Sequence, residues 1–155
     1  MKKNKLILIL ILNIIFSQKI LIPMDEEQTD HLKAYGIAFW SLENNDPLNW
    51  LLNFKGGSFL LEGKEKIQQE CILRGVKYYT VNGSKLNEIY STIENNNMEI
   101  VLLEKSPKIA VYSPPEKQPW DDAVTLALTY AEIKYDVIYD DEVLNGELSN
   151  YDWLH

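Results

Sequence analysis

The stretch "KIAVYSPPEKQPWDDAVTLALTYAEIKYDVIYD", residues 108–140, decides the fold class of this chain. Two short apolar runs, "IAVY" and "DVIY", flank a longer segment that is apolar on most sides of a helix. A strand, a helix and a strand with short linkers predict a parallel pair. "DEVLNG" adds a helical turn and "YDWLH" a third strand. We therefore expect an α/β fold, in which residues 108–155 form the first β-α-β-α-β of a doubly wound, flavodoxin-like parallel sheet.

Parallel sheets need helices on both faces, and three strands with one full helix cannot supply them. The sequence ends at His155 within the third expected strand. We therefore expect the chain to be a truncated piece of a longer protein. The alternative is a small complete domain that ends on an edge strand.

Residues 18–104 predict a separate, mixed α/β unit. Strands are expected at 20–24, 76–81 and 98–104, and a hairpin at 49–63 turns at "KGGS". Asp25 is expected to cap the first helix, and Gly75 to end the second. The residues of the first helix expected to face the core are Leu32, Tyr35, Gly36, Phe39 and Leu42.

Residues 1–17 resemble a secretory signal peptide. Three lysines in "MKKNK" precede the apolar run "LILILILNIIF", which is shorter than the roughly 20 residues of a membrane span. We expect an exported protein, periplasmic or extracellular, with no membrane span once the signal is cleaved. An uncleaved N-terminal anchor is the alternative.

Charge and cysteine content exclude several classes of function. The formal net charge of -8, without a basic cluster, argues against nucleic-acid binding. Cys71 is the only cysteine, so the chain has no internal disulfide, and its place between apolar helix positions predicts a buried thiol.

The loop "VYSPPEKQPWDD", residues 111–122, lies at the edge of the expected parallel sheet where ligands usually bind. It has no glycine, and Asp121 and Asp122 would repel a phosphate at the following helix. The loop still suits a polar or cationic ligand, with Trp120 as a wall and Asp121 or Asp122 as hydrogen-bond acceptor. Helix capping and a packed tryptophan are the simpler interpretation.

Two further candidates are weaker. Lys55, Gly56 and Gly57 have the composition of an anion-binding loop, although a plain hairpin turn is favoured. His155 lies at the ligand edge of the third expected strand. A single histidine defines no metal site, and we expect none; no motif identifies a cofactor. In "YDDE" we expect Asp140 or Asp141 to cap a helix.

Three segments, at 21–40, 49–61 and 119–155, resemble an exported family of the Bacteroidota type that is often labelled asparagine synthetase B. The resemblance covers nearly all of 20–155 and implies a longer protein, with a histidine-rich stretch after "DWLH". The motifs of true asparagine synthetases are absent, because residue 2 is Lys and "KGGSF" lacks the Ser and Asp of an SGGxD loop. The portion from residue 108 resembles class I glutamine amidotransferase-like domains, without their nucleophilic cysteine.

These observations leave three hypotheses about function. The first is an exported, non-catalytic protein that binds a small polar ligand or another envelope protein. The second is an amide- or carbohydrate-processing hydrolase whose catalytic residues lie beyond residue 155. The third is the amide ligase that the family label implies, which would need ATP.

Overall fold

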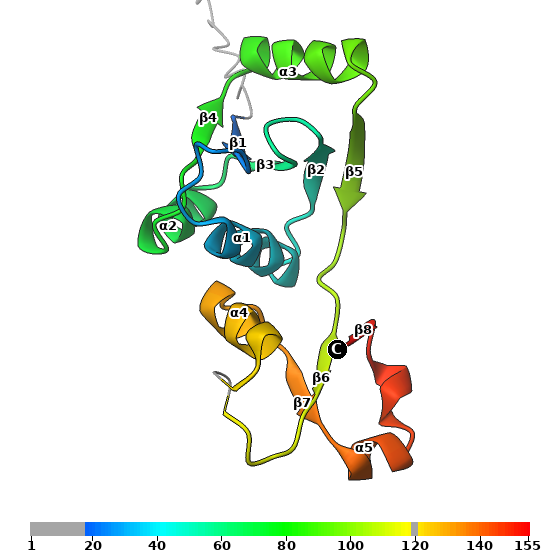
Figure 1. The fold of residues 1–155 in the computed structure, drawn as a ribbon. Coiled ribbons are helices and arrows are strands. Elements are labelled where there is room, and N and C mark those ends of the chain that lie inside the picture. Colours follow the sequence, from blue (N-terminus) through cyan, green and yellow to red (C-terminus); the bar gives the residue numbers. More distant parts are fainter. Residues whose placement is uncertain (1–17, 119–120) are drawn as a thin grey trace, which may run out of the picture.

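The computed structural model describes residues 18–118 and 121–155, so the expected signal peptide and Trp120 lie outside the described residues. These residues form two sheets and five α-helices. In chain order the elements are β1 (Lys19–Ile22), α1 (His31–Glu43), β2 (Leu48–Leu52), β3 (Ser58–Glu62), α2 (Glu65–Leu73), β4 (Tyr79–Val81), α3 (Gly83–Asn95), β5 (Glu99–Leu103), β6 (Ile109–Tyr112), α4 (Ala123–Ala131), β7 (Asp136–Ile138), α5 (Asp140–Leu144), the 3₁₀ turn η2 (Glu147–Asn150) and β8 (Trp153–Leu154). Figure 1 shows an antiparallel unit joined to a parallel unit through the chain between β5 and β6. The predicted mixed α/β content is confirmed.

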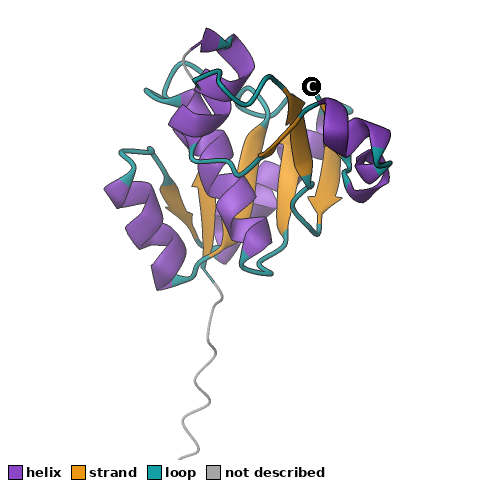
Figure 2. Cartoon of the chain, turned by 90° about the horizontal axis from the view of Figure 1, so that it is seen from below, coloured by secondary structure: helices purple, strands orange, loops and turns teal. Residues whose placement is uncertain are grey.

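The antiparallel sheet has the order β4-β1-β3-β2-β5 and is covered by helices on both faces. Side chains alternate between the faces of a strand. Ile20 and Ile22 of β1 accordingly pack in the core formed with α1 and α2, whereas Leu21 packs in the core formed with α3. Figure 2 shows helices on both sides of the strands. The unit therefore has two core layers.

The predicted hairpin is present. β2 pairs with β3 in antiparallel register, with Trp50 opposite Phe59. Lys55, Gly56 and Gly57 all have positive φ angles in the turn, where glycine costs least. The Trp50 indole donates a hydrogen bond of 2.9 Å to the Gly57 carbonyl and so fixes the end of the turn.

The first helix begins later than predicted, because α1 is capped by Asp30 and not by Asp25. The Asp25 carboxylate instead forms an ion pair with Lys55 at 3.2 Å. Gln28, three residues after Asp25, is buried before the helix begins, and its side chain forms hydrogen bonds with the backbone of Lys77, just before β4. Contacts distant in sequence thus hold this segment outside the helix.

The buried stripe of α1 also differs from the prediction. Gly36, Phe39 and Leu42 are buried as expected, but Leu32 is 43% and Tyr35 44% exposed. The helix packs against the sheet on one side and against α4 on another. Its buried face is therefore wider than predicted and includes Ala34, Ile37 and Ala38 in place of Leu32 and Tyr35. A prediction that assumes one packing surface does not describe a helix that packs against both a sheet and a second helix.

The end of α2 follows the prediction at Gly75. The amide of Val76 donates to the Cys71 carbonyl at 2.8 Å, and Gly75 has a φ of +70°. This is the hydrogen-bond pattern of a Schellman cap. Cys71 itself is fully buried, and burial raises the pKa of its thiol to about 12. The expected burial of the thiol is confirmed.

Asp46 is a buried carboxylate just after α1, with a side chain only 4% exposed. Lys64 and Lys66 both form ion pairs with it. Burial alone would raise the pKa of Asp46, but hydrogen bonds from the two lysines lower it below its ordinary value. The pair of lysines thereby fixes the chain entering β2 against the start of α2.

The second sheet is parallel, as predicted, with the order β7-β6-β8. On one face, Ile109 and Val111 pack against Leu128 of α4 and also against Phe39 of α1. A helix from the first unit therefore supplies cover that the sequence of 108–155 lacks. The other face lies beside the short α5 and η2, where Leu144 stays 83% exposed.

The two units are joined by a close contact between α1 and α4. A Cβ atom added to Gly36 would lie 1.9 Å from the carbonyl oxygen of Ala131. Around this contact, Lys33 and Arg74 both form ion pairs with Glu132, at 2.6 and 3.4 Å. None of the helices formed by the described residues is long and apolar enough to cross a membrane.

Candidate functional site

The loop expected to bind a ligand is closed by its own hydrogen bonds. The carboxylate of Asp121 accepts from the Gln118 amide at 3.2 Å, and the Asp121 amide donates to the Gln118 carbonyl at 2.9 Å. Trp120, its proposed partner, lies outside the described residues. In this arrangement Asp121 is exposed and closes a turn.

Asp122 caps α4, as the simpler interpretation held. Its Oδ1 accepts hydrogen bonds from the amides of Val124 at 2.8 Å and Thr125 at 3.0 Å. Hydrogen bonds from the Thr125 and Val124 amides lower the pKa of Asp122 below its ordinary value. The cap of α4 follows β6 along the chain, and His155 pairs with Ala110 and Tyr112 of β6, so both lie at the carboxyl edge of the sheet.

His155 extends the line of β8 beside the central strand. Its amide donates to the Ala110 carbonyl at 3.0 Å, and its carbonyl accepts from the Tyr112 amide at 2.8 Å. The imidazole is exposed beside the carboxyl end of β6. No group of three or more His, Cys, Asp or Glu side chains suited to a metal ion occurs among the described residues.

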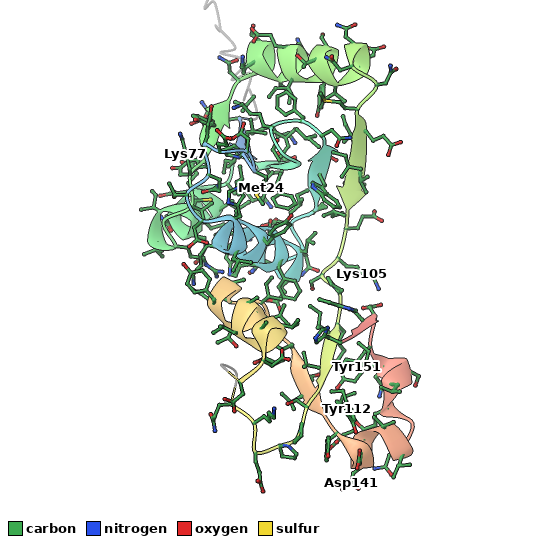
Figure 3. The ribbon with its side chains drawn as sticks, viewed as in Figure 1. Met24, Lys77, Lys105, Tyr112, Asp141 and Tyr151 are labelled. Carbon is green, nitrogen blue, oxygen red and sulfur yellow. The ribbon has the colours of Figure 1, made fainter. Side chains whose placement is uncertain are left out.

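A hollow of about 450 Å³ opens at this edge, on the face that carries α5 and η2. The carboxylate of Asp140 and the phenol of Tyr112 form its polar part, joined by a hydrogen bond of 2.6 Å from the phenol. Its remaining lining residues are apolar: Val143, Leu144, Leu148 and Leu154. Figure 3 shows Tyr112 near α5, whose first turn contains Asp141.

The polar pair carries a negative charge on Asp140 and is exposed to solvent. Among residues 18–118 and 121–155, no lysine or arginine forms an ion pair with Asp140. Its hydrogen bond from Tyr112 raises the pKa of that phenol to about 12, so the phenol stays a neutral donor. An ionised carboxylate has about four acceptor positions, and Tyr112 occupies one of them.

The expected capping role of Asp140 or Asp141 is wrong. The N-cap of α5 is Tyr139, whose amide donates to the Glu142 carboxylate at 2.9 Å, and Asp140 is the first helical residue. Tyr139 also packs its ring against that of Tyr112, with centroids 5.2 Å apart. Asp140 therefore has no capping role, and its carboxylate accepts the hydrogen bond from Tyr112 at the lining of the hollow.

Lys55, Gly56 and Gly57 do not converge with this edge. Lys55 forms ion pairs with Asp25 and with Glu27 at 3.0 Å, and the hydrogen bond to Glu27 is the main cause of its raised pKa. A Cβ atom on Gly56 would lie 2.2 Å from the Met24 carbonyl oxygen. These residues therefore hold the hairpin against the chain after β1, where two carboxylates would oppose an anion.

A second hollow, of about 240 Å³, lies between the two units. Its walls are almost wholly apolar and include the rings of Tyr35, Phe39, Trp50, Phe59 and Trp153. No sequence motif pointed to it, because its walls come from both units. It lacks a polar group to orient a ligand, so the edge hollow is the better candidate site.

Comparison of the chain with protein-family models, with curated proteins and with solved structures finds no match in any of the three. The family resemblance of the sequence therefore stays a prediction, and the functional argument depends on the geometry of the site.

Proposed function

We propose that this protein binds a small organic cation, such as a primary amine with an apolar body, in the hollow at the carboxyl edge of its parallel sheet. The observation that carries the proposal is Asp140, an exposed carboxylate at the rim of an apolar hollow, which accepts a hydrogen bond from the Tyr112 phenol and forms no ion pair with the lysines and arginines of the described residues. An ammonium group could form an ion pair with this carboxylate, while the leucines cover the apolar body of the ligand. The protein acts in this proposal as a binding protein and not as an enzyme.

The order of strands supports the location. β6, the first strand of this unit in the chain, lies in the middle of the sheet, between β7 and β8. This is how a flavodoxin-like sheet begins, and we propose that arrangement for residues 108–155. Ligands of such sheets bind outside the carboxyl ends of the strands, where Tyr112 and Asp140 lie. The signal-like residues 1–17 further suggest that the ligand is met outside the cytoplasm.

The test is calorimetric titration with benzylamine and with benzyl alcohol, which share an apolar ring and differ in charge. We expect benzylamine to bind up to about fivefold more tightly than benzyl alcohol, since an ion pair with an exposed carboxylate contributes about 0.2–1 kcal/mol. Asp140→Asn should remove this preference for the amine. Asp141→Asn is the matched control. It removes the same charge at the neighbouring residue, whose side chain does not line the hollow.

Equal binding of the amine and the alcohol would contradict the proposal, as would an Asp140→Asn variant that keeps the preference. Loss of the preference in both variants would show that overall charge, and not the site, attracts the amine.

A further inference from the structure

β5 is an edge strand of the antiparallel sheet whose first four residues are exposed, while Leu103 packs against the core. It pairs with β2 over five residues, and no described strand lies on its other side. Ile100 is 43%, Val101 36% and Leu102 58% exposed. Figure 1 shows the strand at the outer margin of its unit. A strand in this position presents a row of unpaired backbone donors and acceptors.

β5 has few of the features by which edge strands usually avoid pairing, and its one charged residue is Glu99. Its sequence, "EIVLL", has no proline, lysine or glycine, and its register with β2 is continuous, without a bulge. The opposite edge of the sheet, β4, is only three residues long and follows Lys77. One edge of the sheet is thus short, whereas the other is open and regular.

We propose that β5 pairs with β5 of a second copy of this chain, antiparallel and centred on Val101. In this register Val101 faces its own copy, Ile100 faces Leu102, and Glu99 faces Leu103. Every directly opposed pair then contains at least one apolar residue, and no two carboxylates face each other. A parallel pairing in register would instead place Glu99 beside Glu99. The strand can therefore pair with its own copy without opposing like charges, and a second copy is the occupant that we propose.

The expected dimer is weak. Five residues from each copy bury much less than the roughly 800 Å² per partner of a stable interface. The net charge of -8 on each chain also opposes association, and salt screens that repulsion. We therefore expect a monomer–dimer equilibrium with a dissociation constant between about 1 μM and 1 mM, strengthened by added salt.

The test is sedimentation equilibrium of the wild-type protein and of Val101→Lys and Val101→Glu. Each substitution places two like charges directly opposite in the proposed register, so each variant alone should be monomeric. An equimolar mixture of the two should associate again, because lysine then faces glutamate. Val137→Lys is the matched control, since Val137 is 51% exposed on β7, an edge strand of the other sheet, and this variant should associate like the wild type.

Hydrogen exchange of the wild-type β5 amides at low and high protein concentration gives a test that needs no variant. We expect protection that rises with concentration in β5 and not in β4. A wild-type protein that stays monomeric to about 1 mM would overturn the proposal. Association of the Val101→Lys variant as strong as that of the wild type would also overturn it. A protein that stays monomeric while β5 binds unrelated extended peptides would overturn it as well.

Discussion

Gly36→Ala tests the contact that joins the two units, because two effects of opposite sign compete at this position. Replacing a glycine within a helix by alanine normally stabilises a protein by about 1 kcal/mol. Here, however, the new methyl group would lie 1.9 Å from the Ala131 carbonyl oxygen and 3.0 Å from its carbonyl carbon. The obstacle is backbone and not a flexible side chain, so α1 and α4 would have to move apart.

The magnitude follows from that geometry. Overpacking costs about 1–3 kcal/mol, and a backbone obstacle places this case at the upper end. Subtracting the gain in helix propensity leaves a net loss of about 2 kcal/mol, which corresponds to a fall in Tm of about 4–8 °C. The separation would also loosen the cluster of Phe39 with Leu128 between the units.

The assay is urea denaturation followed by circular dichroism, with hydrogen exchange at α4 as a local readout. Ser91→Ala, at an exposed position of α3, is the control for helix propensity and should stabilise by a few tenths of a kcal/mol. A Gly36→Ala protein at least as stable as the wild type would refute the close packing of α1 on α4.

Three further predictions concern single titratable groups. Asp46→Asn should lower the free energy of unfolding by about 1–3 kcal/mol at pH 7. Because the pKa of Asp46 is lowered in the folded state, the carboxylate stabilises the protein above the ordinary carboxyl pKa. Urea denaturation at several pH values should show this stabilisation disappear as the pH falls through the folded-state pKa. Cys71, buried and with a pKa of about 12, should resist iodoacetamide at pH 8 in the native protein and react in urea, as mass spectrometry would show. Tyr112 should titrate near its pKa of about 12 by NMR of ring-labelled tyrosine, and Asp140→Asn should bring that pKa down; titration of Tyr112 near 10 in the wild type would contradict the hydrogen bond.

Features set by local chemistry were predictable from the sequence. The turn of the 48–62 hairpin and the glycine cap at Gly75 depend on residues within a few positions of each other. The parallel pairing of β6 with β7 followed from the short β-α-β spacing. The start of α1 was mispredicted because Asp25 is held by Lys55, which is 30 residues away.

The sequence predicted the location of the candidate site but not the residues that pair within it. The carboxyl edge of the sheet followed from the order of elements, and it contains His155 and Asp122. The pairing of Tyr112 with Asp140 spans 28 residues and depends on the register of two strands, which no local pattern encodes. The inter-unit hollow was missed for the same reason, since its two walls are far apart in sequence.

The most direct test of cation binding is a titration of the isotope-labelled protein with benzylamine, followed by backbone amide NMR shifts. The account predicts saturable shifts around Tyr112, Asp140 and Leu154, with no comparable change in the antiparallel sheet. Benzyl alcohol at the same concentrations should shift these amides less, because it lacks the charge that pairs with Asp140. Shifts centred on the inter-unit hollow, or equal shifts with both compounds, would contradict a cation site at the carboxyl edge.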